Sequence, residues 1–359
     1  MVTLEKILII RFSSMGDIIL TSPLIRVLRK TYPQAKIDFL VKSEYGELLQ
    51  CNNHISSVIK LETSTGDELQ SLRQRIRAAR YSAIFDLHNS LRSRYLRTFS
   101  GATYVRVVKK NVFARFLLVN LKKNYYPKHV PPVAERYLET ARRFGVRDDG
   151  EGLEVCISDE LCSSVSELLT KFSLQRYKQV IGIVPASKHL TKRWPPERFV
   201  ELGVKIAHEG NTKTLVFGGK EDIEYCGDIA QMINAQVGWT AVENFAGTFS
   251  LLETAAAFDH CHLIISNDTG LMHLAAARKR KVAAIFGSTV REFGFFPYGT
   301  ENIVVERTGL YCRPCSHIGL DKCPENHFRC MKEIQADDVY SAVQQLLNAT
   351  STEMIPTHA

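Results

Sequence analysis

The chain has 359 residues, of which 45% are hydrophobic and 9% aromatic, and this suits a globular protein of two domains that each bury a core. No stretch reaches the roughly 18 consecutive apolar residues of a membrane-spanning helix, and the N-terminus enters an apolar strand without the features of a signal peptide. We therefore expect a cytoplasmic protein. Its formal net charge is +8, and the basic residues are unevenly distributed.

The first part of the sequence alternates strands and helices. Residues 6–12, KILIIRF, have a largely apolar run, as in a parallel strand covered on both faces, and a Ser-Ser-Met-Gly-Asp turn follows. A helix is predicted from this turn to about Tyr32, and Ser22 before Pro23 is placed to cap or restart it. The pattern then predicts strands at 36–41, 55–61 and 81–88, with an amphipathic helix at 68–80. This order indicates a doubly wound α/β domain.

A basic stretch interrupts the pattern. Residues 87–134 contain no Asp or Glu, and aromatic residues are interleaved with the basic ones. We expect a partly helical insertion here. Such a stretch suits an anionic surface or an anionic ligand, and an ordinary solvated basic face is the alternative. Its basic residues include Arg92, Arg94, Arg97, Lys109 and Lys110.

A second alternating series follows a helix predicted at residues 161–172. Strands are expected at 179–187, 212–219, 261–266 and 282–288, and helices at 195–210, 221–233, 250–258 and 271–278. The sequence thus predicts two domains, residues 1–170 and 171–335. The last helix, about 336–348, with the tail to residue 359, is predicted to pack back on the first domain.

Ligands of such sheets bind at the carboxyl ends of the strands, so residues that follow strands are the informative ones. Asp17 follows the first strand, where it is either a helix-capping carboxylate or a general base. The turn lacks both the GxGxxG pattern of dinucleotide-binding folds and the P-loop pattern.

Two further segments after strands favour an anionic ligand. Ser187, Lys188, Lys192 and Arg193 share one loop before a helix, where a phosphate would meet ammonium and N–H groups together. The alternative is a set of surface lysines, with Trp194 packed against the domain.

The second segment, "SNDTGLMHLAAA", joins a strand to a helix. Thr269 and Gly270 can offer a hydroxyl and open N–H groups to a diphosphate, and His273 lies on the same helical face. Asp268 would repel phosphate, so it either caps the helix or accepts hydrogen bonds from sugar hydroxyls. His273 is either a ligand-binding or a structural residue.

Four cysteines near the C-terminus have the spacing C-x2-C-x7-C-x6-C: Cys312, Cys315, Cys323 and Cys330. Their first pair fits a structural zinc site, whereas free thiols in a reducing cytoplasm fit the whole set better. We predict no metal.

The chain resembles the bacterial lipopolysaccharide-core heptosyltransferases of glycosyltransferase family 9. The resemblance rests on "ILIIRFSSMGDIILTSPLIRVLRKTYP", "KRWPPERF" and "SNDTGLMHLAAA" in this order, and it spans nearly the whole chain. It implies a GT-B fold, in which two Rossmann-like domains face each other across a cleft. It also implies inverting transfer of heptose from ADP-L-glycero-β-D-manno-heptose to the lipopolysaccharide inner core, with no cofactor.

The resemblance implies a role for each matched residue. Asp17 falls on the family's base, and Lys192, with Ser187 and Lys188, falls on its diphosphate-binding loop. Glu221 is placed at the nucleoside ribose. The late motif, Asp268, Thr269, Gly270 and His273, holds the diphosphate and the sugar.

The basic stretch would then meet the Kdo carboxylates and lipid A phosphates of the acceptor at an anionic membrane surface. Arg92, Arg94, Arg97, Lys109 and Lys110 are the candidate acceptor-binding residues. We expect a monomer, located in the cytoplasm or at the cytoplasmic face of the inner membrane.

Two other functions are considered. A nucleotide-sugar epimerase of similar fold would form product from the donor alone. A zinc-ribbon protein would bind nucleic acid through the basic stretch, but this would leave both strand-end motifs of the second domain without a role, so we expect no nucleic-acid partner.

Overall fold

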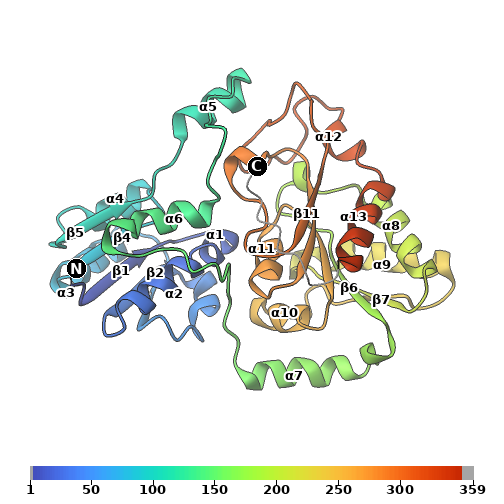
Figure 1. Cartoon of the computed structure of the whole chain (residues 1–359), viewed down its shortest axis with the longest axis horizontal. Helices are drawn as coiled ribbons and strands as arrows, with labels where there is room; N and C mark the ends of the chain where they lie inside the picture. Colours follow the sequence, from blue (N-terminus) through green and yellow to red (C-terminus); the bar gives the residue numbers. More distant parts are fainter. Residues whose placement is uncertain (1–2, 350–359) are drawn as a thin grey trace.

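The computed structural model describes residues 3–349, which form two parallel sheets flanked by helices (Figure 1). The first sheet has the order β3-β2-β1-β4-β5. Its strands are β1 (Lys6–Ile10), β2 (Lys36–Lys42), β3 (Ser57–Leu61), β4 (Ala83–Asp86) and β5 (Tyr104–Val107). Because β1 is central, it is nearly all buried, which agrees with its continuous apolar sequence.

The helices of the first half begin and end where the sequence provides signals. They are α1 (Met15–Ile19), α2 (Ser22–Thr31), α3 (Gly66–Ala79), α4 (Leu91–Arg97), α5 (Val112–Leu121) and α6 (Val133–Ala141). The single helix predicted up to Tyr32 is divided in two, and α2 restarts with Pro23 in its first turn, a position that proline tolerates.

The second sheet has the order β11-β10-β9-β6-β7-β8, the strand order of a Rossmann-like sheet. Its strands are β6 (Gln179–Val184), β7 (Thr212–Val216), β8 (Val242–Asn244), β9 (Leu263–Asn267), β10 (Lys281–Phe286) and β11 (Asn302–Glu306). The helices are α7 (Asp159–Thr170), α8 (Pro196–His208), α9 (Ile223–Val237), α10 (Leu251–Phe258), α11 (Gly270–Ala277), α12 (Arg329–Lys332) and α13 (Ala336–Asn348). No helix within residues 3–349 is both long and apolar enough to cross a bilayer.

The last helix departs from the sequence-based expectation. It was predicted to pack back on the first domain, and this prediction is wrong, because α13 packs on α8 and on β10 and β11 of the second sheet. Buried Val339 and Val343 belong to the same hydrophobic cluster as Trp194, whose indole N–H donates to the Ile334 carbonyl at 3.1 Å. The expected tail beyond residue 349 lies outside the described residues.

The segment that connects the two halves, which includes residues 148–154, makes polar contacts with both of them. Arg26 of α2 pairs with Asp149 at 2.7 Å and with Glu154 at 2.9 Å, both in the connecting segment. On the other side, Tyr298 donates to Asp148 at 2.8 Å. Because α7 packs against α10, this helix belongs by its contacts to the second half, although it precedes residue 170.

Gly152 in this connection predicts a measurable effect on stability. Its φ is +64°, and a Cβ there would lie 2.7 Å from the carbonyl oxygen of Gly299. Gly150 has a similar φ of +77° with open space around it. We expect Gly150→Ala to lower the free energy of unfolding by about 1 kcal/mol and Gly152→Ala by about 3 kcal/mol, because only the latter adds a backbone clash. Urea unfolding measures both, and equal losses would contradict the close approach.

Candidate active site

The candidate site lies where α1 of the first half packs against α11 of the second. A Cβ on Gly16 would lie 2.7 Å from Cδ2 of His273, and a Cβ on Gly270 would overlap Cε of Met15. Each helix therefore presents a glycine to a side chain of the other. Since α1 follows β1 and α11 follows β9, this packing brings together the carboxyl ends of two strands from different sheets. Ligands of such sheets bind at these ends, so the location agrees with the expectation from the sequence.

Asp17 is the acidic group on the first side of this contact. Arg11 Nη2 lies 2.7 Å from its Oδ2, and the Ser14 hydroxyl donates to the same oxygen at 3.0 Å. The Tyr137 hydroxyl donates to Oδ1 at 3.2 Å. Burial by itself would raise the pKa of Asp17, but the Arg11 guanidinium and the Ser14 hydrogen bonds outweigh it and lower that pKa. Asp17 is therefore ionised at neutral pH.

Arg11 and Tyr137 are site residues that the sequence analysis missed. Arg11 directly follows β1 and is buried, with Nη1 donating to the Leu87 carbonyl at 2.7 Å. An arginine in an apolar strand segment requires a buried partner, so the sequence did contain a signal for it. Tyr137 comes from α6, and burial raises its pKa, which keeps its hydroxyl protonated as a donor. Nothing in its local sequence marks this role.

On the second side, the loop after β6 meets the loop after β9. Lys192 Nζ lies 2.7 Å from Asp268 Oδ2, and the Thr289 hydroxyl donates to the same oxygen at 2.6 Å. The Ser187 hydroxyl donates to the main-chain carbonyl of Asp268 at 3.4 Å. The Asp268 carboxylate thus holds the lysine, an arrangement that the sequence analysis did not anticipate.

His273 lies between these two acidic groups. His273 is only 3% exposed, and its Nδ1 has no hydrogen-bond partner among residues 3–349. Burial lowers its pKa to about 4, although Asp268 and Asp17 act in the opposite direction. The ring is therefore neutral at pH 7, and it packs in contact with the Gly16 backbone region.

The remaining donor-side candidates lie on the loops that follow β6, β7 and β9. Thr269 is the N-cap residue of α11 but makes no side-chain cap bond, and Gly270 begins the helix. Lys188 is exposed in the loop after β6. Glu221 follows β7, and its carboxylate folds back to within 2.7 Å of the position a Cβ on Gly219 would take. Arg193 of the same basic loop donates to the Ser187 carbonyl at 2.6 Å, so it supports the loop internally.

The five candidate acceptor residues separate into two groups. Arg97 Nε lies 2.9 Å from the buried Asp86 carboxylate, and Lys110 Nζ donates to the His88 carbonyl at 2.6 Å, so both have structural partners. Arg92, Arg94 and Lys109 are exposed, and Lys110 is exposed as well although it is bonded to main-chain carbonyls.

Basic groups from both halves converge near the site. Burial lowers the pKa of His317, and Arg115, Lys192 and Lys110 lower it further. These three cations therefore lie within electrostatic reach of one imidazole, although Lys192 belongs to the second half and the other two to the basic stretch. The region between the halves is thus positively charged around the Asp17 carboxylate.

The four C-terminal cysteines are free thiols. Cys312 Sγ lies 3.7 Å from Nε2 of His327. In the described part of the chain, no group of three or more His, Cys, Asp or Glu side chains is arranged to hold a metal ion.

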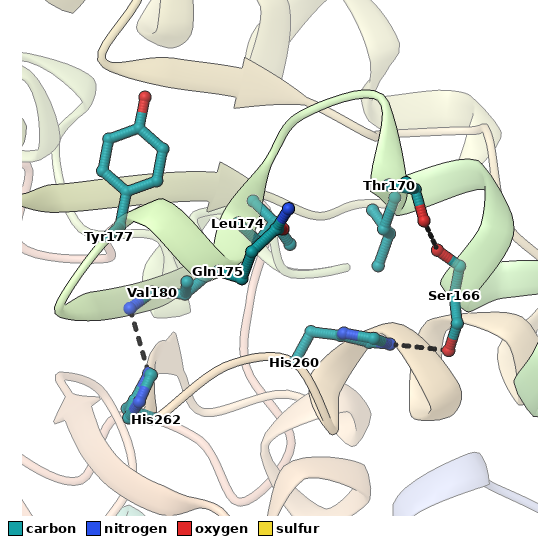
Figure 2. Close-up of a pocket in the computed structure, with 9 residues that line it drawn as sticks. Ser166, Thr170, Leu174, Gln175, Tyr177, Val180, His260 and His262 are labelled. Atoms are coloured by element: carbon teal, nitrogen blue, oxygen red, sulfur yellow. Dashed lines mark hydrogen bonds between the residues drawn. The ribbon is translucent and has the colours of Figure 1, made fainter.

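A separate hollow of about 460 Å³ lies beside α7 and η3 (Leu174–Arg176) (Figure 2). In it, His260 Nε2 lies 3.1 Å from the Ser166 hydroxyl, and His262 Nδ1 accepts from the Val180 N–H at 3.0 Å. None of the residues discussed for the candidate site lines it.

Comparison with known proteins identifies the family of this chain. A family model described as glycosyltransferase family 9 (heptosyltransferase) matches residues 69–324. The chain belongs to glycosyltransferase family 9. It is 28% identical over 298 residues to lipopolysaccharide heptosyltransferase 2 of Escherichia coli K12, covering 80% of this chain and 84% of that protein. It is 25% identical over 347 residues to lipopolysaccharide heptosyltransferase 3 of the same strain, covering 92% and 95%.

Solved structures show that this family 9 chain has the GT-B fold. A family 9 glycosyltransferase from Veillonella parvula superposes with a TM-score of 0.78 at 24% identity, over 96% of this chain and 98% of that one. Escherichia coli ADP-heptose lps heptosyltransferase II superposes with a TM-score of 0.70 at 23% identity, over 95% and 98%. The predicted fold class, family and enzyme class are confirmed: this family 9 chain is a glycosyltransferase with two Rossmann-like halves.

The buried His273 of this family 9 enzyme predicts a pH-dependent stability. Its pKa is about 4 in the folded chain and about 6.5 in the unfolded chain. The stability that depends on the neutral ring is therefore complete above pH 6.5 and is lost as the pH falls towards 4. Lowering the pH from 6.5 to 5 should remove about 2 kcal/mol of the free energy of unfolding through this residue.

Urea unfolding at both pH values tests this expectation. His273→Gln should lose less stability on acidification than the wild type, by that amount, whereas His208→Gln, at an exposed histidine of α8, should behave as the wild type. An unchanged pH dependence in His273→Gln would contradict the assignment.

Proposed function

We propose that this glycosyltransferase moves a heptose from ADP-L-glycero-β-D-manno-heptose to the inner core of lipopolysaccharide, with inversion at the anomeric carbon. Two relatives are named lipopolysaccharide heptosyltransferases, and a solved structure of similar fold is named an ADP-heptose lps heptosyltransferase, which supports a heptose donor and a lipopolysaccharide acceptor. The observation that carries the proposal is the packing of α1 on α11, which places the Asp17 carboxylate of one half opposite the Lys192–Asp268 pair of the other.

The first domain, residues 1–170, would bind the acceptor and supply the base. Asp17 is ionised, so it can accept the proton of an acceptor hydroxyl. A lowered pKa makes it a weak base, and this is sufficient if the bond to the leaving group breaks early. In an oxocarbenium-like transition state, the acceptor oxygen becomes acidic only as its new bond forms, so proton transfer is late.

The second domain, residues 171–335, would bind the donor. The diphosphate would be bound by two lysines of the loop after β6, by Ser187 and by the start of α11: Lys188, Lys192, Ser187, Thr269 and Gly270. Departure of ADP leaves negative charge on the diphosphate, and a preorganised ammonium group stabilises that charge.

Binding of the donor would also change the partners of Asp268. If the diphosphate takes Lys192, the Asp268 carboxylate keeps Thr289 and can accept hydrogen bonds from the heptose hydroxyls. Glu221 would contact the ribose. His273, neutral and buried, would position α1 against α11 beside the sugar.

The acceptor carries carboxylates and phosphates on a lipid anchor, which fits the positive region around Asp17. Exposed Arg92, Arg94 and Lys109 would bind these groups directly, whereas Arg97 and Lys110 would act through the structure of the basic stretch. The reaction would then take place at the cytoplasmic face of an anionic membrane, with the enzyme as a peripheral monomer.

Replacing the base should stop transfer without disturbing donor binding. We expect Asp17→Asn to lower kcat by about 10²-fold or more, because Asn cannot take the proton, and to change ADP affinity by less than about threefold. The assay incubates the full chain with ADP-heptose and defined truncated core acceptors and measures product mass. Asp67→Asn, at an exposed acid of α3, is the matched control.

Substantial activity in Asp17→Asn would exclude Asp17 as the base. Product formed from the donor without any acceptor would instead indicate an epimerase.

Removing the positive charge at Lys192 should weaken ADP binding. Lys192→Gln keeps a donor for Asp268 but loses the charge, so we expect ADP affinity to fall by about tenfold or more. Thr269→Val should weaken ADP binding while leaving the melting temperature nearly unchanged. Isothermal titration measures the ADP affinity of both variants, and Lys171→Gln, at an exposed lysine after α7, should bind ADP as the wild type does. Wild-type affinity in Lys192→Gln would contradict the assigned diphosphate site.

A further inference from the structure

The helix α5 exposes an unusual amount of apolar surface. Its residue Phe113 is 75% exposed and Phe116 is 56% exposed, and Val112 and Leu121 are exposed as well. Residues 112, 113 and 116 lie on one side of the helix, because positions three and four apart are neighbours on a helix. In Figure 1, α5 projects from the body of the first half, away from both sheets. Contiguous apolar surface of this kind marks an interaction site.

The surroundings of this helix are strongly basic. Residues 87–134, which include α5, contain no Asp or Glu. Lys109 and Lys110 precede the helix, Arg115 lies within it, and Lys123 and Lys128 follow it. A short helix with exposed aromatic residues and flanking cations has the composition of an interfacial membrane-binding helix.

Polar contacts hold α5 in this projecting position at both ends. Before the helix, Lys110 Nζ donates to the main-chain carbonyls of His88 and Asn89, at 2.6 and 3.3 Å. After it, Lys122 Nζ donates to the carbonyls of Cys312 and Pro314, at 3.0 and 2.7 Å. The segments on either side of α5 are thus bonded to both halves, and the apolar residues of the helix remain exposed.

From this geometry we infer that α5 inserts its apolar side, Val112, Phe113 and Phe116, into the headgroup region of an anionic bilayer. The inference deepens the proposed function, on which it rests, by naming the element that seats the enzyme at its lipid-anchored acceptor. Ten residues of helix are about 15 Å long, so α5 lies in the interface and does not cross it.

Charge decides between a bilayer and a second copy of the chain as the occupant. In a two-fold symmetric dimer, the same patch would face itself, and the basic residues around α5 would meet each other without any acidic partner from residues 87–134. Anionic headgroups instead complement these cations, each of which contributes favourably near such a surface.

The test compares the full-length wild type with the double variant Phe113→Ser/Phe116→Ser. Sedimentation with vesicles measures binding to phosphatidylcholine alone and to phosphatidylcholine with phosphatidylglycerol. We expect the wild type to bind the anionic vesicles and the double variant to bind them with an affinity at least about tenfold lower. Trp239→Ser removes a half-exposed aromatic side chain of the second half and should bind as the wild type.

Activity provides the second readout. With a water-soluble, deacylated acceptor, the double variant should match the wild type, and with the acceptor embedded in vesicles it should be slower. Circular dichroism melting confirms that both variants fold. Equal vesicle binding by the wild type and the double variant would overturn the inference, as would a wild-type dimer that the double variant loses.

The two proposals fail separately. Vesicle binding that depends on Phe113 and Phe116, without transfer of heptose to any core acceptor, would refute the proposed function and leave the lipid-binding helix established.

Discussion

The contact between Gly16 and His273 is the constraint on which the site depends. A Cβ at residue 16 would overlap the imidazole, and a Cβ at Gly270 would overlap Met15, so the two halves can approach this closely only because both positions are glycine. The approach brings Asp17 and the Lys192–Asp268 pair to the same junction. Any side chain at either glycine would have to push α1 away from α11, and Asp17 would then separate from the Lys192–Asp268 pair.

The charges at this junction are paired within each half. Asp17 pairs with Arg11 and Asp268 pairs with Lys192, so neither of these two carboxylates is buried as a lone ion, which would be costly. Because these charges are already paired, a charged ligand would have to replace one partner of a pair. In the proposed reaction, a diphosphate would have to compete with the Asp268 carboxylate for Lys192. It would therefore gain from other donors nearby, such as Thr269, whose hydroxyl makes no helix-cap bond. The acceptor hydroxyl of the proposed reaction, in contrast, would meet a carboxylate that is already ionised.

The sequence predicted the parts of the fold with strong, local signals. Central strands such as β1 and β9 are continuously apolar and were found, whereas the edge strands β5, β8 and β11 are short or only half-buried and were not. The amphipathic pattern of α13 identifies an apolar face but not the sheet that covers it, which explains its wrong placement. In the site, most candidate residues after strands were identified, but Arg11 was missed although it directly follows β1. Tyr137 and Thr289 were missed because their partners are distant in sequence.

The basic stretch shows why charge alone does not define a binding surface. Arg97 neutralises the buried Asp86, and Lys110 and Lys122 are occupied by main-chain carbonyls, so part of the positive charge serves the fold. Those same bonds determine what the remaining residues can do. A membrane-binding helix on a free tether would leave the active site unoriented, but Lys122 ties α5 to the second half while the chain itself ties it to the first. A bilayer that binds α5 therefore meets both halves in one orientation, with Asp17 and Lys192 at a fixed position relative to the lipid.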